Sequence, residues 1–115
     1  PTWLRSILGH LIKNGLLHVN ASVHAPLISV ATQFDGAWVK LSVADNGTGV
    51  REDIRELLFR QPIDHDQSTR SVGMGRGLLL VRYIAEAYGG AAWLERTEIG
   101  KGSRFVVLLP VAEAR

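Results

Sequence analysis

The sequence contains no cysteine, so neither a disulfide framework nor a thiolate metal site is available to it. Long apolar runs are also missing, because stretches such as residues 77–81 and 105–109 are far shorter than the ~20 residues that span a bilayer. Neither charge sign dominates, since 13 Lys and Arg are spread along the chain with 11 Asp and Glu. We therefore expect no nucleic-acid partner and a cytoplasmic location, whether or not a parent protein is membrane-anchored.

What the sequence does contain is the composition of a globular domain. Hydrophobic residues make up 46% and charged residues 21% of the 115 residues. This length is enough for one hydrophobic core and too short for two domains. Because a helical pattern begins directly after Pro1, we interpret residues 1–115 as one domain of a longer protein.

The first predicted element is an amphipathic helix over residues 2–18, where apolar residues recur at helical spacing. Three polar side chains, His10, Asn14 and His18, border or enter the apolar face of this helix. Local patterns tend to break at functional sites, so these three residues are candidates for one.

Two strands are predicted at residues 27–34 and 37–45, joined at Asp35 and Gly36 by a typical hairpin turn. Asp45 ends the second strand on the same face as its core-like residues, where a carboxylate needs a hydrogen-bonding partner. Gly47 and Gly49 follow, and glycine lets a backbone approach a flat ligand closely. The stretch indicates a site for a nucleotide base.

The second half of the chain is predicted to contain two helices and two strands. We expect helices at residues 51–59 and 78–88, a mobile polar segment at 60–72, and strands at 91–97 and 103–109. Three glycines, at 73, 75 and 77, precede the second of these helices, and a glycine-rich turn before a helix can bind phosphate. The spacing of the glycines matches neither the Rossmann nor the P-loop fingerprint.

Four motifs, taken together and in order, resemble those of the GHKL ATPase superfamily, most closely the catalytic domain of bacterial sensor histidine kinases. They are an N box at residues 8–15 (L-G-H-L-I-K-N-G), a G1 box at 45–49 (D-N-G-T-G), a G2 box at 73–78 (G-M-G-R-G-L) and a final-strand motif at 100–103 (G-K-G-S). The resemblance implies the Bergerat ATP-binding fold. This is an α/β two-layer sandwich, in which a mixed, mostly antiparallel sheet carries helices on one face and a flexible ATP lid.

The resemblance also implies a role for individual residues. Asp45 would accept a hydrogen bond from the adenine amino group, Gly47 and Gly49 would let the loop approach the base, and Asn14 would help to hold Mg²⁺. His10 and Asn14 would be the catalytic residues of the N box. Further contacts with the nucleotide are implied for His18, Arg70, Gly73, Gly75, Arg76, Gly77, Leu78 and Ser103.

The function implied by the resemblance is transfer of the γ-phosphoryl group of ATP to a histidine on a separate dimerisation domain of the same protein, with a response regulator downstream. None of the histidines present stands in a recognisable phosphoacceptor context. We therefore expect the acceptor, its dimerisation helices and the first strand of the family fold to lie outside this chain. The isolated domain should be a monomer and its parent a homodimer.

Three departures from the family pattern leave alternatives open. His10 replaces the usual Asn or Glu of the N box, Leu17 replaces a basic residue, and Arg76 replaces an apolar residue of the G2 box. The chain could therefore be a catalytically impaired pseudokinase or a nucleotide-sensing binding module. A further alternative is an anti-sigma-factor serine kinase.

Overall fold

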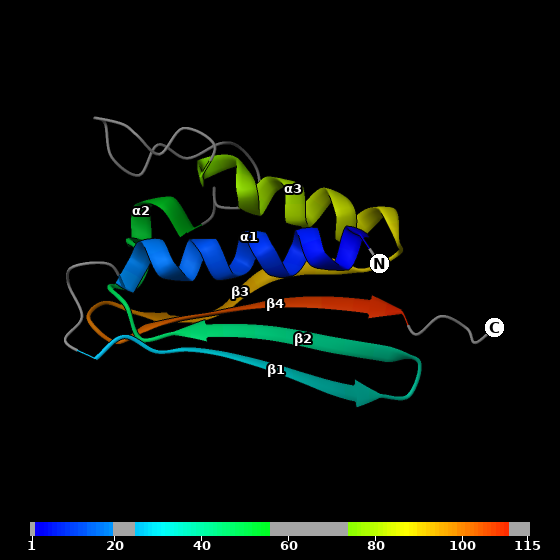
Figure 1. Cartoon of the computed structure of the whole chain (residues 1–115), viewed down its shortest axis with the longest axis horizontal. Coiled ribbons are helices and arrows are strands. Elements are labelled where there is room, and N and C mark those ends of the chain that lie inside the picture. Colours follow the sequence, from blue (N-terminus) through cyan, green and yellow to red (C-terminus); the bar gives the residue numbers. More distant parts are fainter. Residues whose placement is uncertain (1, 20–24, 56–73, 111–115) are drawn as a thin grey trace.

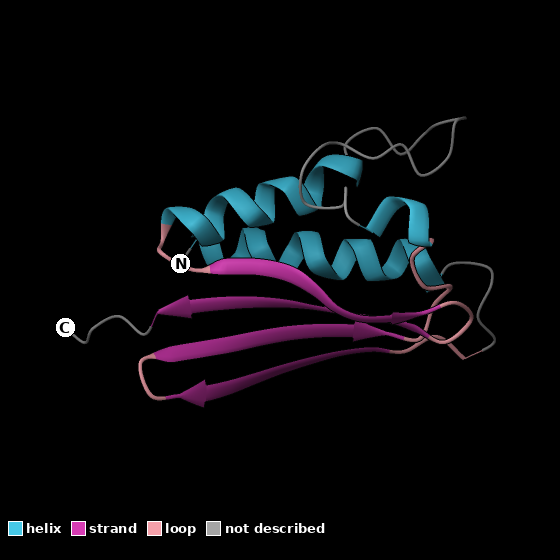
Figure 2. Ribbon diagram, turned by 180° about the vertical axis from the view of Figure 1, so that it is seen from behind, coloured by secondary structure: helices cyan, strands magenta, loops and turns pink. Residues whose placement is uncertain are grey.

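The computed structural model describes residues 2–19, 25–55 and 74–110. These residues form two layers, with the helices on one face of a sheet (Figure 1). The view from behind shows the same separation, with the opposite face of the sheet bare of helices (Figure 2). Within the described residues, no helix is both long and apolar enough to cross a membrane.

The sheet contains four described strands: β1 (Ile28–Asp35), β2 (Trp38–Asp45), β3 (Ala91–Glu98) and β4 (Gly102–Pro110). Their order is β1-β2-β4-β3, and each neighbouring pair is antiparallel. The predicted hairpin is present, because Asp35 pairs with Trp38 and Gly36 turns the chain with a φ of +61°. The expected two-layer fold with a mostly antiparallel sheet is confirmed.

Helices α1 (Thr2–Val19) and α3 (Met74–Ala87) cover the sheet and supply half of its core. Alternation along the strands sends every second side chain toward these helices. The core residues are Ile7, Leu11, Leu41, Val43, Val50, Leu78, Val81, Ala85, Phe105, Val107 and Leu109. At one end of the helix layer, the rings of Trp3 and Tyr88 stack with centroids 4.5 Å apart and join the start of α1 to the end of α3.

Helix α3 begins four residues earlier than the sequence pattern predicts, at Met74 instead of Leu78. Gly75 and Gly77 therefore lie inside the first turn of the helix, where glycine is tolerated although it favours other conformations. A Cβ atom at Gly77 would lie 3.2 Å from Nδ1 of His10 on α1. The glycine thus lets α1 and α3 pack closely at this point.

Helix α2 (Glu52–Arg55) is the described part of the helix predicted for residues 51–59. Its first turn carries Glu52 and Asp53, which suit the positive end of the helix dipole. Arg55 Nε donates a hydrogen bond to the Val50 carbonyl oxygen at 3.0 Å and ties α2 to the preceding loop. The segment 60–72 that was predicted to be mobile lies outside the described residues.

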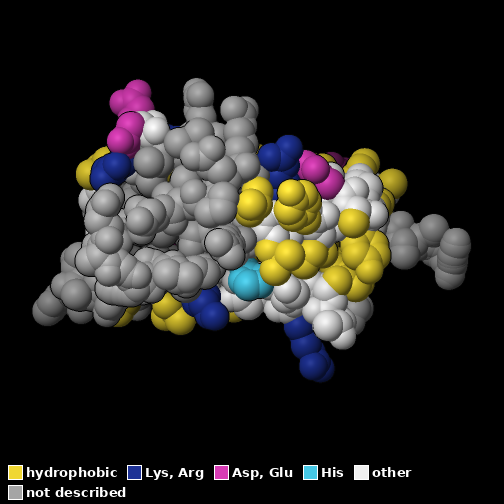
Figure 3. Space-filling view, turned by 90° about the horizontal axis from the view of Figure 1, so that it is seen from above, with side chains coloured by type: hydrophobic (Ala, Val, Ile, Leu, Met, Phe, Trp, Pro, Cys, Tyr) yellow, Lys and Arg dark blue, Asp and Glu magenta, His cyan; other side chains and the backbone are white. Residues whose placement is uncertain are grey.

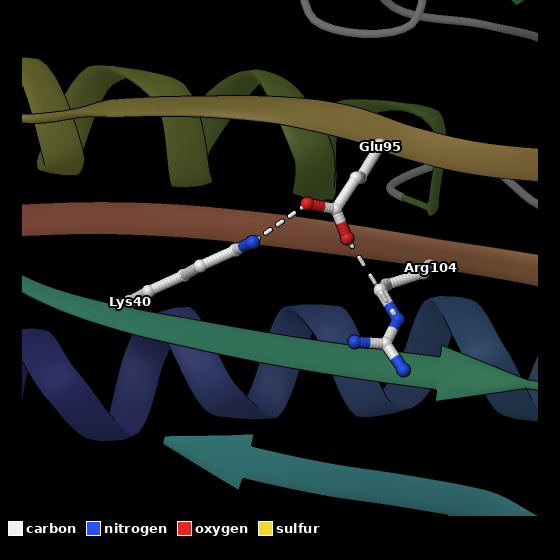
Figure 4. A network of polar contacts seen from close by, with 3 residues as sticks. All are labelled: Lys40, Glu95 and Arg104. Atoms are coloured by element: carbon white, nitrogen blue, oxygen red, sulfur yellow. Dashed lines mark hydrogen bonds and ion pairs between the residues drawn. The ribbon is translucent and has the colours of Figure 1, made fainter. Parts of the chain in front are cut away.

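The face of the sheet away from the helices carries an ion network that joins three strands (Figure 4). Lys40 Nζ lies 2.7 Å from Glu95 Oε2, and Arg104 Nε lies 3.8 Å from Glu95 Oε1. The hydrogen bond from Lys40 is the main reason why the pKa of Glu95 is lowered. The network links β2, β3 and β4 across a surface that no described helix covers.

Candidate functional site

Asp45 ends strand β2 on the helix-covered face of the sheet, as its alternation with Val43 predicts. Gly47 N donates a hydrogen bond to Asp45 Oδ1 at 2.8 Å, so the carboxylate has a partner of the kind that its position requires. This bond turns the chain directly after the strand. The Asp45 residue as a whole is partly buried.

The loop after Asp45 packs against the turn between β3 and β4. A Cβ atom at Gly49 would lie 2.6 Å from the carbonyl oxygen of Glu98, and Gly100 N donates to the Thr48 carbonyl oxygen at 2.9 Å. Gly49 also has a φ of +82°, which favours glycine. The packing and the backbone conformation therefore require glycine at position 49 independently of any ligand. Its predicted approach to a base stays a prediction.

Asn46 fixes the chain that leads into β1, a role that the sequence analysis did not identify. Its Oδ1 accepts a hydrogen bond from Leu27 N at 2.9 Å, and its Nδ2 donates to the Ala25 carbonyl oxygen at 2.9 Å. The bonds span about twenty residues of sequence, so only the folded arrangement reveals them. The only signal in the sequence is an Asn at a strand end, which is common in turns.

Helix α1 brings the N box over the end of β2. A Cβ atom at Gly15 would lie 3.6 Å from the Cβ atom of Asp45, so the helix backbone and the carboxylate are neighbours. Asn14, the residue before, has only 5% of its surface exposed. Among the described hydrogen bonds, none engages its Nδ2 atom, and such an unpaired buried group calls for an explanation.

A ligand group would explain the unpaired amide of Asn14. An amide supplies both an N–H donor for a phosphate oxygen and a hard carbonyl oxygen for Mg²⁺. Magnesium in nucleotide sites takes few protein ligands and completes its shell with phosphate oxygens and water. The residues present therefore fit ATP with Mg²⁺, with Asn14 as the protein group that would hold the metal.

His10 lies on α1, one turn before Asn14, and packs against the first turn of α3. Its Nδ1 atom is the closest neighbour of the position that a Cβ atom at Gly77 would occupy, at 3.2 Å. Partial burial, and then the charge of Lys13, lower the pKa of His10 from its usual value of 6.5. The imidazole is therefore neutral at pH 7.

Ser103 begins the helix-facing row of β4 directly opposite Asp45 and has only 3% of its surface exposed. Its Oγ atom lies 2.8 Å from Oγ1 of Thr97 on β3, and Thr97 Oγ1 also accepts a hydrogen bond from Val50 N at 2.9 Å. Ser103 was a candidate site residue from the sequence, whereas Thr97 was not. These hydroxyls join the end of the loop after β2 to both strands of the final hairpin.

The structure describes most of the predicted site residues and leaves the others wholly or partly undescribed. Asp45 stands opposite Ser103 and lies next to Gly15, the residue after Asn14 in α1. His10 lies one turn before Asn14 and is next to Gly77 at the start of α3. Leu78 is placed in the hydrophobic core with 3% of its surface exposed. Arg70 and Gly73 lie outside the described residues; for Gly75, Arg76 and His18, the structure describes only the helical backbone.

The outer surface of the helix layer is partly apolar (Figure 3). On α3 and directly after it, Leu80, Tyr83 and Tyr88 keep 40%, 64% and 49% of their surfaces exposed. Exposed apolar patches of this kind are typical of surfaces that contact another protein element. This surface adjoins α1, which carries His10 and Asn14.

Comparisons with known proteins agree with this arrangement. The model of the histidine kinase-, DNA gyrase B- and HSP90-like ATPase family matches residues 1–113. The sensor histidine kinase ZraS of Escherichia coli O157:H7 is 36% identical over 111 residues, covering 96% of this chain and 22% of ZraS. The chain thus spans about a fifth of the length of that relative.

The solved structures that resemble the fold include those of MprB and ShkA. The mycobacterial sensor histidine kinase MprB matches with a TM-score of 0.76 at 20% identity, over 95% of this chain and 72% of that chain, which shows a shared fold. Full-length ShkA, solved in complex with AMPPNP, matches with a TM-score of 0.72 at 32% identity, over 97% of this chain and 22% of ShkA.

The resemblance drawn from the four sequence motifs is therefore confirmed at the level of the family and of the fold. The relatives that match over nearly the whole chain include sensor histidine kinases. The chain belongs to the family of histidine kinase-, DNA gyrase B- and HSP90-like ATPases, and within it resembles the ATPase domain of sensor kinases.

Proposed function

We propose that the chain binds ATP with Mg²⁺ and presents the γ-phosphoryl group to a histidine on a dimerisation domain of the same protein. The observation that carries the proposal is the approach of the N box to Asp45, where Gly15 and Asp45 are separated by 3.6 Å between Cβ positions. A base-reading carboxylate and a buried amide suited to a metal and phosphates thus lie at one end of the fold.

Base recognition would depend on Asp45. One oxygen of its carboxylate accepts the hydrogen bond from Gly47 N, and the carboxylate would accept another from the 6-amino group of adenine. Guanine has a carbonyl oxygen at that position, which faces the carboxylate without a proton to donate. A buried polar group left unpaired in this way gives strong discrimination.

Phosphate positioning would depend on Asn14 and on the start of α3. When bound, Mg²⁺ supplies charge neutralisation between the phosphate oxygens, and Asn14 would orient it through the amide oxygen. The first turn of α3 offers unpaired backbone N–H groups and a positive dipole end. The chain's contribution would therefore be to hold the phosphates in line for an incoming histidine, which is catalysis by positioning.

The acceptor histidine would come from a partner domain that docks on the helix layer. The chain spans 22% of ZraS, so there is ample sequence in such relatives for a dimerisation domain. The exposed apolar side chains of Leu80, Tyr83 and Tyr88 offer a surface for it beside α1. A response regulator would then take the phosphoryl group from the histidine, and the parent would act as a homodimer.

A nucleotide-binding module without phosphotransfer is the second candidate. The packing of His10 against Gly77 favours it, because the residue that replaces the usual Asn or Glu of the N box is used to join two helices. Such a module would keep the base site at Asp45 and lack the group that supports transfer.

Calorimetric titration of the chain with ATP and Mg²⁺ tests the binding step. Asp45→Asn keeps an oxygen for the Gly47 N–H and should lower affinity about 10- to 100-fold, the value of a charge-assisted hydrogen bond. Asp53→Asn is the matched control, since Asp53 is exposed and paired with Arg51 on the surface. Equal affinity of Asp45→Asn and wild type would contradict the proposed site.

Phosphotransfer is tested in the full-length protein with labelled ATP. The proposal expects acid-labile, base-stable phosphate, which is the signature of phosphohistidine. Binding of ATP without any such phosphate would refute the transferase function and leave the nucleotide-binding module.

A further inference from the structure

The open face of the sheet carries two arginines that stand directly opposite each other. Arg96 on β3 pairs with Arg104 on β4 in the antiparallel ladder. Like charges at directly opposed positions of a sheet repel each other and destabilise it. Positions where a structure breaks such a local rule are often functional, so this pair is a candidate for an anion-binding surface.

A β-bulge creates this concentration of charge. The register of β3 shifts between Leu94 and Arg96, with Glu95 as the extra residue. Glu95 reaches Lys40 and Arg104 on the open face (Figure 4). Arg96 is on the same face, because it pairs with Arg104. Two successive residues of β3 therefore project to one side, where strict alternation would place only one of them.

One carboxylate is shared among the three cations at this position. Lys40 Nζ makes the shortest contact with Glu95, at 2.7 Å, whereas Arg104 Nε lies 3.8 Å from the same carboxylate. The hydrogen bond from Lys40 is the main cause of the lowered pKa of Glu95, and the charges of Arg104 and Arg96 lower it further. Within the described part of the chain, Arg104 Nε is buried without a hydrogen-bond partner. The cluster therefore keeps an excess of positive charge and an unused donor.

The surroundings of the cations decide which kind of anion fits. The next carboxylate along β3 is that of Glu98, which lies 3.6 Å from Lys101 Nζ and is engaged there. Trp93 pairs with Val106, two residues along β4 from Arg104, and keeps 37% of its surface exposed. The indole ring offers an apolar contact beside guanidinium groups that suit a carboxylate. This combination fits a protein segment in which acidic and apolar side chains alternate.

A nucleic acid or an anionic membrane fits this surface less well. Both present many negative charges and are bound by cations spread over a wide area. Here the excess of cations is confined to one position of the sheet, and the whole chain has a net charge of only +2. A short segment with a few carboxylates matches the extent of the cluster.

We propose that the surface formed by Arg96, Arg104 and Trp93 is a docking site for an acidic segment of a protein partner. Carboxylates of the segment bind the two guanidinium groups, and an apolar side chain of the segment packs on the indole ring. This docking surface lies on the open face of the sheet, whereas Asp45 faces the helices. The proposal therefore goes beyond the proposed function and does not depend on nucleotide binding.

The test titrates the chain with a short capped peptide in which glutamate and leucine alternate. NMR follows the Nε–H signals of Arg96 and Arg104 and the indole N–H signal of Trp93, which should shift together and saturate. The same peptide with glutamine in place of glutamate should shift none of them. Arg96→Gln and Arg104→Gln should each weaken binding about 3- to 10-fold, the value of one hydrogen bond. High salt should weaken binding to wild type.

Two variants separate the docking surface from a general effect of charge. Lys101→Gln removes the same charge from an exposed residue of the turn between β3 and β4, so it should leave the affinity for the peptide unchanged. Glu95→Gln removes the carboxylate that competes for the arginines, so it should raise the affinity. Unchanged amide signals in the core of α1 and α3 show that each variant is folded.

Any of three outcomes overturns the proposal. The first is the absence of saturable shifts at Arg96, Arg104 and Trp93. The second is an equal loss of affinity in Lys101→Gln and Arg96→Gln. The third is binding to vesicles of phosphatidylserine and phosphatidylcholine, but not to the peptide, which would assign the surface to a membrane. Calorimetry with ATP and Mg²⁺ should give the same affinity for Arg96→Gln and wild type, so the proposed function is tested separately.

Discussion

Gly102 and Asp45 approach each other so closely that a Cβ atom at Gly102 would lie 2.0 Å from the Asp45 carbonyl oxygen. Gly102 also has a φ of +120°, where side chains are strained. Gly102→Ala must therefore move the end of β2 that carries the carboxylate. We expect the free energy of unfolding to fall by roughly 2–5 kcal/mol, from backbone strain and overpacking together. Urea denaturation measures this change.

Gly100→Ala is the matched control in the same turn. Gly100 has a φ of +83° but no atom within 4 Å of a Cβ position. Its substitution should lower the free energy of unfolding by only about 1–2 kcal/mol, the cost of the left-handed conformation. Equal losses in the two variants would mean that the contact with Asp45 does not matter.

Local signals in the sequence were sufficient to predict most of the fold. The hairpin at Asp35 and Gly36 and the position of Asp45 follow from strand alternation and turn chemistry, which act over a few residues. The approach of Gly15, the residue after Asn14, to Asp45 is different, because no local pattern joins residues so far apart. It was anticipated only through the order of the four motifs and their family resemblance.

Thr97 could not have been predicted from alternation along β3. Counting from Leu94, which packs against the core, every second residue would face the helices, which sends Thr97 to the opposite face. A register shift between Leu94 and Arg96 adds one residue and reverses the alternation. Thr97 then pairs with Ser103. The contact between the hydroxyls of Thr97 and Ser103 therefore depends on a bulge that no pattern in the sequence predicts.

Asn14 should be a residue where stability and function conflict. Replacement by an apolar residue of similar shape removes a buried amide whose Nδ2 atom has no partner among the described residues. We expect Asn14→Leu to leave the free energy of unfolding equal or higher, because an unpaired buried group costs about 1–3 kcal/mol. The affinity for ATP with Mg²⁺ should fall at the same time.

Chemical denaturation and calorimetry of Asn14→Leu check the two halves of this expectation separately. A loss of stability would mean that the amide has a structural partner. Unchanged nucleotide affinity with unchanged stability would remove Asn14 from the site. Ser42→Ala serves as a control, since Ser42 is also buried, with 7% of its surface exposed, and lies on the far face of β2.

His10 should make stability depend on pH between its folded pKa and its usual pKa of 6.5. Burial lowers the pKa in the folded state, so the unfolded chain binds more protons in this interval. Stability is therefore full above pH 6.5 and falls as the pH drops toward the folded pKa. Because Lys13 also lowers the pKa, Lys13→Gln should raise it.

His10→Gln tests this dependence, because glutamine keeps a polar side chain that does not titrate. Subtracting its stability curve from that of wild type removes the contributions of the other histidines. As the pH falls below 6.5, the free energy of unfolding of the variant should rise relative to that of wild type. A flat difference would show that burial does not affect the imidazole, and NMR titration of the ring would give the pKa directly.

Two helical glycines should respond differently to substitution by alanine. Gly9 lies within α1 with no atom within 4 Å of a Cβ position, so Gly9→Ala should add up to about 1 kcal/mol through helix propensity. At Gly77 the same gain is opposed, because the Cβ atom would displace His10. Thermal denaturation should therefore raise the midpoint for Gly9→Ala only. An equal rise of the midpoint in both variants would mean that a Cβ atom at Gly77 fits between α1 and α3 without displacing His10.

The carboxylate of Glu95 joins Lys40 and Arg104 on the open face of the sheet (Figure 4). Its pKa is lowered from 4.5, first by the hydrogen bond from Lys40, so its contribution to stability is present above pH 4.5 and is lost as the pH falls through the folded pKa. About a third of each side chain is exposed, so water and salt screen the pair, and we expect a coupling energy of only about 0.5–1 kcal/mol.

A double-mutant cycle of Lys40→Met and Glu95→Gln at pH 7 and pH 3 isolates this coupling from the single effects. The charge interaction predicts a coupling at pH 7 that is smaller at pH 3, because acid favours the protonated form of Glu95, and that weakens in high salt. Packing of the Lys40 stem against its neighbours predicts a coupling that is the same at both pH values. Only the charge interaction depends on protonation and salt. A coupling energy that stays constant under both changes would therefore assign the link between β2 and β3 to packing alone.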